Sequence, residues 1–551
     1  MLLSCASVRA QTQLVFQGFE TADSWTISAG SGNVSNATGS GDTPASQRIL
    51  AGTNSWQVNN GTGTLDLAST SITGYTGITL TYRVTSTSTT TSNGSDNGDY
   101  VRSFVALNGA AFASNSAANS DIEITGNSNA RWGYDATLTA TTTAATNLQV
   151  ASPQGGTSTN NYSTFVVNVP NGNSSLAFRI IARNNAAAEV WSVDSITLTG
   201  TIPTSATWDA NGATAGTGGT GTWDTTNARF TNGDLIWNNS VNGSPTAVTF
   251  ASTAGVVTLG TGISASALTF SADGYTIQSD TLTLTGSTPT ISVTTAGHSA
   301  TISSVLAGAN SLTKTGAGKL ILSGANSYSG VTSVSNGTLS VTGSLGSGGG
   351  LVSVTATTPD TAALAGTGTV SRSVTIGDRG LISPGTADFN MSSFNINAAS
   401  TTQTFASGGT YRWEVNKLPA AGSAGTNWDT VNFNALTVTA TSGGKFTIKI
   451  VSLNSGGTAA GALSGLSATF GTKYTWVIAL TGGLSGFSAD KFDLDFSSFS
   501  ADQPGFWSLA ASGNNLELTL TIPEPPTAMG AFVLSLAALL RRNRRGCRQC
   551  R

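Results

Sequence analysis

Charge and catalytic side chains are scarce in this chain of 551 residues. Only 9% of the residues are charged, and there is a single histidine. That residue, His298, lies in the turn-like stretch TTAGHS, with no second histidine to share a metal ion and no G-x-S-x-G motif to supply a nucleophile. The ionisable residues of the central region are scattered, whereas catalysis needs them clustered. We therefore expect a protein that is not an enzyme.

The three cysteines, Cys5, Cys547 and Cys550, lie in terminal segments that we expect to be removed or membrane-associated. The C-x-x-C spacing of the last two has no second ligand pair, so we predict neither a metal nor a redox role. Without residues 1–10 and 523–551 the chain loses seven basic residues and one acidic one, which takes its net charge from −3 to −9. A body this acidic is not expected to bind nucleic acid, which requires a basic patch.

Long helical patterns are lacking between Thr12 and Thr521, and proline is rare, with 13 residues. Apolar residues make up 38% of the chain and occur in short runs between clusters of glycine, serine, threonine and asparagine. Such regular spacing is typical of packed β-structure rather than of disorder. Since the chain is too long for a single core, we predict an all-β protein of several domains.

The chain is organised around residues 312–341, LTKTGAGKLILSGANSYSGVTSVSNGTLSV, where short apolar alternations are separated by turns. A period of two places Leu320 with Leu322, and Leu339 with Val341, on one face. One such coil cannot bury its apolar face alone, so the stretch predicts a parallel β-solenoid with neighbouring coils on both sides. Glycines stand at the corners, where the chain needs a positive φ or a close approach of backbones: Gly316, Gly318, Gly324, Gly330 and Gly337.

The same stretch resembles the autotransporter-associated β-strand repeat, which is found in passenger domains of exported bacterial proteins. The resemblance implies a β-solenoid and export, and it says little about activity because these repeats form stalks and scaffolds. The matching positions are Leu312, Lys314, Gly316, Gly318, Leu320, Leu322, Gly324, Asn326, Tyr328, Gly330, Asn336, Gly337, Thr338, Leu339 and Val341.

Residues 1–10 are interpreted as a truncated signal peptide, because small residues flank Arg9 at the positions that a signal peptidase reads. Residues 11–200 alternate apolar runs with turn-forming clusters, which predicts a β-sandwich. Its first and last strands resemble those of a jelly-roll module of the carbohydrate-binding type. That resemblance implies a structural Ca²⁺ at Glu20 and Asp194, with a hydrogen-bonded strand end as the alternative.

Five aromatic residues of this region could form a platform on which sugars stack. Sandwiches also bury tryptophan routinely, so core packing is the better interpretation for each ring. The residues are Trp25, Trp56, Trp132, Tyr134 and Trp191.

Residues 201–385 are predicted to form a right-handed parallel β-solenoid. Its first part contains Trp208, Trp223 and Trp237, and we interpret this part as the first coils and the cap that an exposed solenoid end requires. The stretch Ser383-Pro384-Gly385 is predicted to end the regular stack.

Residues 386–521 carry longer alternations, which fit either a β-rich cap or a second sandwich. The densest acidic cluster of the chain, Asp490, Asp493 and Asp495, lies in this part. Because the last two alternate with apolar residues, we interpret them as solvent-facing positions of a strand rather than as a Ca²⁺ loop.

The last segment, residues 522–551, combines three features in a fixed order. Pro523-Glu524-Pro525 is followed by an apolar stretch and then by an arginine cluster, which contains Arg541, Arg542, Arg544 and Arg545. This order resembles the PEP-CTERM sorting signal, which implies transient membrane association through a short hydrophobic helix and cleavage by an exosortase. The apolar stretch is shorter than the roughly 17–25 residues of an ordinary membrane span, and the arginines would stay on the cytoplasmic side.

The sequence thus predicts a non-catalytic, exported, structural or adhesive protein at the cell surface, the outer membrane or the extracellular matrix. Exopolysaccharide or another surface glycan is the expected partner, because the sorting signal implies cells that make such a matrix. The alternative is a carbohydrate-binding or polysaccharide-degrading protein presented on a solenoid stalk, since β-helices can host such enzymes.

Overall fold

The computed structural model describes residues 11–36, 48–88, 93–134, 139–152, 157–158, 163–212, 217–231, 233–243, 246–386, 390–396, 399–502 and 505–523. It divides into two compact units, Met1–Ala272 and Asp273–Arg551. β-Strand is the dominant regular structure of the described residues and helix is almost absent from them, which confirms the predicted all-β class. The helical elements among them are short: α1 (Asn239–Asn242), η1 (Ala117–Asn119), η2 (Pro419–Ala421) and η3 (Ala489–Lys491).

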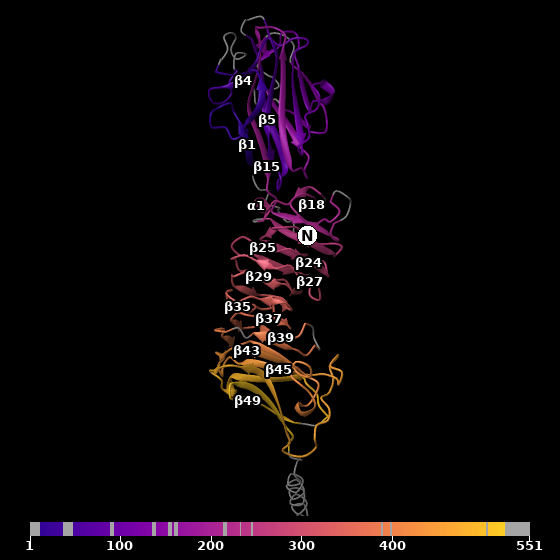
Figure 1. Ribbon diagram of the computed structural model, residues 1–551, viewed down its shortest axis with the longest axis vertical. Helices are drawn as coiled ribbons and strands as arrows, with labels where there is room; N and C mark the ends of the chain where they lie inside the picture. The colour runs from indigo at the N-terminus through magenta and orange to yellow at the C-terminus, as the bar shows by residue number, and fades with distance from the viewer. Residues whose placement is uncertain are drawn as a thin grey trace, which may run out of the picture. The chain divides into compact units, whose positions relative to one another are not determined.

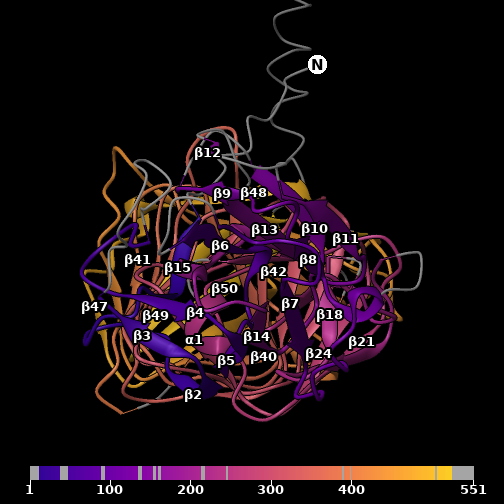
Figure 2. The same cartoon turned by 90° about the horizontal axis from the view of Figure 1, so that it is seen from above.

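The first unit begins with two facing sheets, which Figure 2 shows from above as two layers. One layer has the strand order β10 (Thr139–Thr143), β13 (Thr164–Val169), β6 (Thr76–Ser88), β15 (Glu189–Thr201), β4 (Ser55–Val58) and β3 (Asn33–Ser35), joined by β1 (Thr12–Gln17), β9 (Arg131–Trp132) and β12 (Thr157–Ser158). The other has the order β11 (Leu148–Ala151), β8 (Ile122–Thr125), β7 (Tyr100–Leu107), β14 (Ser175–Asn184), β5 (Gly61–Ser71) and β2 (Ile27–Ser31).

Apolar side chains from both layers form one core between them. Tyr82 of β6 packs against Phe165 of its own layer and Phe178 of the other, with ring centroids 5.6 and 5.4 Å apart. Alternation along the strands explains this arrangement, since it turns every second residue inward. The region is therefore a two-layered β-structure, whereas its jelly-roll connectivity stays a prediction.

After β15 the first unit continues into parallel coils. In one sheet β16 (Ser205–Thr207), β20 (Ala247–Phe250) and β23 (Ala267–Phe270) pair in parallel, and in another β17 (Gly221–Trp223) pairs with β21 (Val256–Leu259). The remaining strands are β18 (Ala228–Phe230), β19 (Leu235–Ile236) and β22 (Ser264–Ala265).

The tryptophans predicted for the first coils are fully buried there. Trp223 meets Trp237 edge to face at 5.1 Å, and Trp208 meets Phe230 at 5.5 Å. On α1, the buried amide of Asn242 donates to the carbonyl oxygen of Gly74 at 2.9 Å. Helix α1 therefore contacts the turn between β5 and β6 of the two-layered region.

The second unit consists of coils whose strands form long parallel sheets (Figure 1). The first sheet runs through β26 (Thr290–Val293), β29 (Leu312–Thr315), β32 (Thr332–Val334), β35 (Val352–Val354), β38 (Val374–Ile376), β41 (Gln403–Phe405), β44 (Leu436–Val438) and β47 (Leu484–Ser485). The second runs through β24 (Tyr275–Ser279), β27 (Ser299–Ile302), β30 (Lys319–Leu322), β33 (Gly337–Val341), β36 (Ala362–Gly366), β39 (Gly380–Pro384), β42 (Thr410–Val415), β45 (Phe446–Ser452) and β48 (Phe492–Ser498).

A third sheet contains β31 (Ala325–Asn326), β34 (Ser344–Leu345), β37 (Thr369–Val370), β40 (Ser393–Ile396), β43 (Thr430–Phe433) and β46 (Lys473–Thr481) in parallel, followed by the antiparallel β50 (Asn515–Thr521) and β49 (Phe506–Ser512). A shorter pair joins β25 (Leu282–Leu284) to β28 (Leu306–Ala307). This arrangement is that of a β-solenoid, while its handedness stays a prediction.

The signature stretch forms a coil as the sequence predicts. Leu320, Leu322, Leu339 and Val341 are all 0% exposed. They lie inside because β30 and β33 pair in parallel, Leu320 beside Leu339 and Leu322 beside Val341. Each coil thus buries its alternate side chains against the same positions of the next coil.

The corner glycines have the two roles that the sequence predicts. Gly316 and Gly337 have positive φ values of 73° and 66°. At Gly318, Gly324 and Gly330 a Cβ atom would lie 2.7 Å or less from atoms of the preceding coil. Any larger residue would therefore push neighbouring coils apart.

The parallel stack extends past Gly385, where the sequence predicts its end. Strands β42, β45 and β48 continue the second sheet in parallel beyond β39. After β39 the strands of the second sheet are longer, and so are several of the connections, so the apolar runs no longer recur at the earlier spacing. Periodicity alone therefore misses this continuation.

Candidate functional site

The parallel register aligns outward-facing side chains of the second sheet in rows. Residues next to buried positions point away from the core, because successive side chains alternate across a strand. One row begins at Lys319 on β30 and continues, strand by strand, through Thr338, Ala363, Leu381, Thr410, Thr447 and Asp493. A second row contains Ala365 beside Ser383, and Arg412 beside Lys449, which in turn lies beside Asp495.

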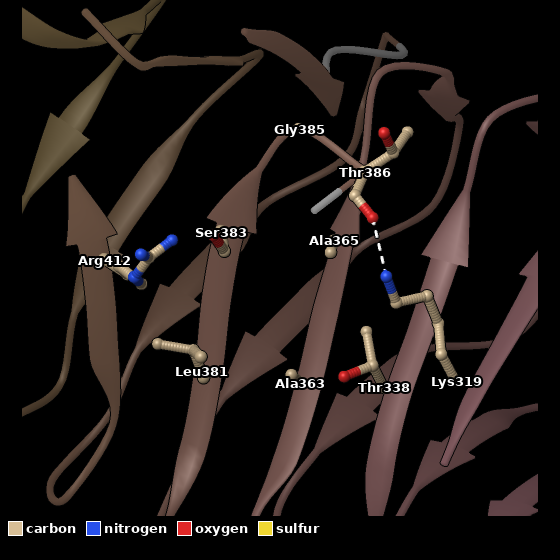
Figure 3. Close-up of a pocket in the computed structure, with 9 residues that line it drawn as sticks. All are labelled: Lys319, Thr338, Ala363, Ala365, Leu381, Ser383, Gly385, Thr386 and Arg412. Carbon is tan, nitrogen blue, oxygen red and sulfur yellow. Dashed lines mark hydrogen bonds between the residues drawn. The ribbon is translucent and has the colours of Figure 1, made fainter. Parts of the chain in front are cut away.

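The two rows border a cavity of about 270 Å³ (Figure 3). Its floor is made of small side chains, among them Ala363 and Ala365 on β36, while Lys319 and Arg412 lie at opposite ends. Gly385, which has a φ of 92°, and Thr386 line one edge of the cavity. There the ammonium group of Lys319 donates to the carbonyl oxygen of Thr386 at 2.8 Å.

A second hollow of about 510 Å³ continues the first along the sheet. The two share Leu381 and Arg412, and the second adds Arg379, Lys449 and Asp495. Threonines from three strands or their margins also line it, namely Thr361, Thr410 and Thr447. We call the two hollows together the solenoid groove.

The solenoid groove is rich in basic residues for this chain. It holds Lys319, Arg379, Arg412 and Lys449, four of the 24 basic residues of a protein with net charge −3. Asp495, Asp493 at the end of the first row and Glu414, which pairs with Arg412, partly offset them. Hydrogen bonds from Ser497, together with the charge of Lys449, hold the carboxyl pKa of Asp495 below the usual value. Hydroxyl groups, cations and a floor of small side chains suit an anionic ligand with many hydroxyl groups.

Beneath Arg412 lies a buried pair of carboxylates, Glu414 and Asp429, both 0% exposed. Arg412 Nη1 contacts Glu414 Oε1 at 2.5 Å. Burial, with the nearby charge of Glu414, raises the pKa of Asp429 well above its usual value. The carboxylates accept hydrogen bonds from the backbone N–H groups of Asn390 and Ser392. The pair therefore anchors residues 390–392, which lead into β40.

The structure brings the two predicted calcium ligands, Glu20 and Asp194, to one segment. Glu20 accepts hydrogen bonds from the backbone N–H groups of Thr53 and Asn54, at 2.6 and 2.8 Å. Asp194 accepts from those of Leu50 and Ala51, at 2.8 and 3.1 Å. These bonds hold residues 50–54, which lead into β4, and both the Ca²⁺ and the alternative of a hydrogen-bonded strand end stay predictions.

Core packing is the correct interpretation of the tryptophans in the two-layered region. Trp25, Trp56, Trp132 and Trp191 are 2% exposed or less, and Trp132 meets Trp191 edge to face at 5.5 Å. Tyr134 is half-buried, and its hydroxyl donates to the carbonyl oxygen of Arg48 at 3.4 Å. The four tryptophans therefore offer no face on which a sugar could stack.

The remaining predicted residues lie where the sequence places them or outside the described residues. His298 lies in the turn before β27, and Asp493 and Asp495 lie on β48, as predicted. In the sorting motif, Pro523 is described, while Glu524, Pro525, Arg541, Arg542, Arg544 and Arg545 lie outside the described residues. Within the part of the chain that is described, no helix is long and apolar enough to cross a membrane.

Sequence reasoning missed the solenoid groove, although it found the strands that build it. The available signal was the set of outward positions in each apolar run, such as Lys319 beside Leu320.

Sequence reasoning also missed a group of carboxylates in the first unit, Asp96, Asp99 and Glu189. One carboxylate oxygen from each of these residues lies within 4.8 Å of those of the other two. Two of these residues come from a short D-N-G-D turn, and the third is 90 residues away in the sequence.

Comparison with known proteins supports the architecture of the solenoid. Residues 312–341 match the family described as Passenger-associated-transport-repeat, which confirms the predicted repeat. Over 144 residues the chain is 40% identical to the Adhesin BmaC autotransporter of Brucella suis biovar 1 (strain 1330). This match covers 25% of the chain and 4% of that protein. The chain therefore spans only a small fraction of the length of this curated relative.

Proposed function

We propose that this protein is an exported, non-catalytic adhesive protein of the cell surface or matrix, and that its solenoid groove binds an acidic polysaccharide. The passenger-type repeat and the similarity to part of an autotransporter adhesin support export and adhesion. The proposal of an acidic polysaccharide as the ligand rests on the alignment of cations and hydroxyl groups in rows along one sheet.

The length of the rows fits a chain-like ligand. Neighbouring strands lie about 4.8 Å apart, so the seven strands from β30 to β48 present a row of roughly 30 Å. A surface of that length can contact several sugars of an extended polymer at once. Sugars along the polymer would meet hydroxyl groups and cations at the polar positions of the rows, and binding would be weak per sugar but additive along the polymer.

Export is proposed to use the sorting tail. In this proposal, residues 522–551 associate transiently with the inner membrane and an exosortase cleaves near Pro523-Glu524-Pro525. The order of motif, apolar stretch and arginine cluster supports this step. The mature protein would then reach the surface or the exopolysaccharide matrix, where the solenoid groove meets its ligand.

The test is binding of the full-length chain to immobilised acidic and neutral polysaccharides at several salt concentrations. We expect tighter binding to the acidic polymer, weakened by salt because the contacts are ionic. The double variant Lys319→Glu/Lys449→Glu should weaken this binding at least tenfold. Lys417→Glu, which changes an exposed lysine outside the groove, is the matched control and should leave binding unchanged.

Equal binding to both polymers, or full binding by the double variant, would contradict the proposal for the solenoid groove. The same samples report on the alternative function. Release of new reducing ends from the polysaccharide would show a degrading enzyme instead of an adhesive protein.

A further inference from the structure

The two-layered region contains a compact group of three carboxylates that the proposed function does not use. Asp96 and Asp99 lie in the turn before β7, and Glu189 begins β15. One carboxylate oxygen from each lies within 4.8 Å of those of the other two. Like charges this close repel one another strongly where water is excluded.

Two members of the group are almost completely buried. Asp99 is 1% exposed and Glu189 is 2% exposed. Burial, followed by the hydrogen bond and the charge of Asp99, raises the pKa of Glu189 to about 8. Burial likewise raises the pKa of Asp99. The surroundings of these two side chains therefore compensate their negative charge only in part.

One buried oxygen of the group also has no hydrogen-bond donor. Within the described residues, Glu189 Oε2 is enclosed and receives no hydrogen bond. A buried oxygen without a partner costs about 1–3 kcal/mol, and more when it is charged. An oxygen without a donor, on one of three clustered carboxylates, is an arrangement that a bound cation would complete.

The rest of the group is held in place by its neighbours. Asp99 accepts hydrogen bonds from the backbone N–H groups of Asp96 and Asn185, both at 2.9 Å. The side-chain amide of Asn185 donates to Asp96 Oδ1 at 2.8 Å. Nearby, Arg102 is paired with Glu123 at 2.6 Å. The carboxylates are thus preorganised, which lowers the entropy that a bound ion would have to overcome.

We propose that Asp96, Asp99 and Glu189 bind a divalent cation, and that this cation is Ca²⁺. Hard carboxylate oxygens are the preferred ligands of both Ca²⁺ and Mg²⁺. The three oxygens lie within 4.8 Å of one another, which fits inside the sphere of Ca²⁺, about 4.6–5.2 Å between opposite oxygens. Ca²⁺ also accepts the flexible geometry of carboxylates from separate segments, whereas Mg²⁺ demands a near-ideal octahedron and keeps several of its waters. Backbone oxygens or water complete the six to eight ligands that Ca²⁺ takes.

This site is separate from the solenoid groove and from Glu20 and Asp194. The bound ion would join the turn at Asp96 to the start of β15 and to the preceding turn at Asn185. It would therefore stabilise one end of the two-layered region, since a ligand that binds only the folded state raises stability by mass action. The proposal is independent of any glycan.

The experiment is titration of the chelator-treated full-length protein with CaCl₂, followed by calorimetry and by thermal unfolding. We expect saturable binding and a melting temperature that rises with the Ca²⁺ concentration. Glu189→Gln, which keeps the shape of the side chain, should weaken binding at this site at least tenfold, and Asp96→Asn at a half-buried position should do the same. Glu20→Gln is the matched control and should keep the Glu189-dependent binding.

Hydrogen exchange measured with Ca²⁺ and with chelator locates the effect. Ca²⁺ should slow exchange at residues 95–99 and 185–189 in the original chain and not in Glu189→Gln. Absence of Ca²⁺ binding, or Ca²⁺ binding that neither variant weakens, would overturn the proposal. In that case Glu189 is a protonated partner of Asp99, and Glu189→Gln would melt no lower than the original chain in chelator.

Discussion

Arg372 shows how single polar residues hold this solenoid together from inside. It is 2% exposed, and its guanidinium group donates to the carbonyl oxygens of Gly346 and Gly330 at 3.1 and 3.3 Å and to that of Tyr328. Its charged group also lies 4.4 Å from the centre of the Tyr328 ring. One side chain therefore donates to carbonyl groups of two preceding coils. The planar guanidinium group suits this role because its N–H donors point in several fixed directions.

We predict that Arg372→Lys lowers the free energy of unfolding by about 2–4 kcal/mol. The lysine keeps the charge but cannot reach three carbonyl oxygens in different directions, so buried acceptors lose their partners. Thermal unfolding of the full-length chain measures the loss, and faster hydrogen exchange at residues 328–346 would locate it. The control is Arg379→Lys, at a partly exposed turn, where we expect less than about 1 kcal/mol. Equal stability of the two variants would show that the hydrogen bonds of Arg372 do not stabilise the contact between coils.

At the scale of the element, the signature coil is closed by buried polar side chains at its corners. Asn326 on β31 accepts a hydrogen bond from the backbone N–H of Leu306 at 3.0 Å and donates to the carbonyl oxygens of Gly324 and Ser344 at 3.0 and 3.1 Å. It thus bonds to the coil before and the coil after its own. These side-chain hydrogen bonds link neighbouring coils at the corner and satisfy backbone groups that strand pairing leaves without a partner there.

Lys314 has the same role at another corner. It is 0% exposed, and its ammonium group donates to the carbonyl oxygens of Thr315, Gly316 and Asn336 at 2.7, 2.8 and 3.0 Å. Burial lowers the pKa of Lys314 to about 7, although the three acceptors match the three donors of an ammonium group. The positions that define the repeat are thus structural, which explains why the signature indicates architecture better than activity.

We predict that Asn326→Asp destabilises the coil by about 2–3 kcal/mol. The carboxylate has the shape of the amide and can still accept from Leu306, but it cannot donate, and it faces two carbonyl oxygens in a buried place. Hydrogen exchange of the full-length chain should rise first at residues 302–345. Asn310→Asp is the matched control, because Asn310 is half-buried and donates one hydrogen bond, to Leu284. A larger effect at Asn310 than at Asn326 would contradict this account.

At the scale of the whole molecule, we propose that the solenoid remains in the mature protein and that the C-terminal tail is cleaved off during export. The described coils contain the groove, whereas the tail carries the arginine cluster. A short apolar stretch followed by arginines favours a temporary position in the inner membrane over a permanent span. In this proposal, processing and binding depend on different parts of the chain, so they can be tested separately.

We predict that protein recovered from the surface or matrix fraction of a native culture ends near Pro523-Glu524-Pro525. Mass spectrometry of the termini in each cell fraction measures this. Replacing Arg541, Arg542, Arg544 and Arg545 with glutamine should leave uncleaved protein in the cells, because the cytoplasmic charge that orients the tail is lost. An intact arginine tail in the inner-membrane fraction of the original strain would instead mean a retained anchor, and the surface model would be abandoned.

The sequence by itself determined the local features of this fold. Alternation placed Leu320, Leu322, Leu339 and Val341 inside, because side-chain direction along a strand depends only on the neighbouring residues. The role of the glycines at the corners could also be predicted from the sequence, since a positive φ and close backbone contact exclude larger residues. Burial of the tryptophans followed from the large apolar area of that side chain.

Only the tertiary structure decided which distant residues meet. The register of the coils places Lys319 and Arg412 on one groove, and the return of β15 beside β6 carries Glu189 to the turn that holds Asp96 and Asp99. The extension of the stack past Gly385 also depends on pairing between coils of unequal length. These features are set by contacts between residues far apart in the chain, which leave no regular spacing in the sequence.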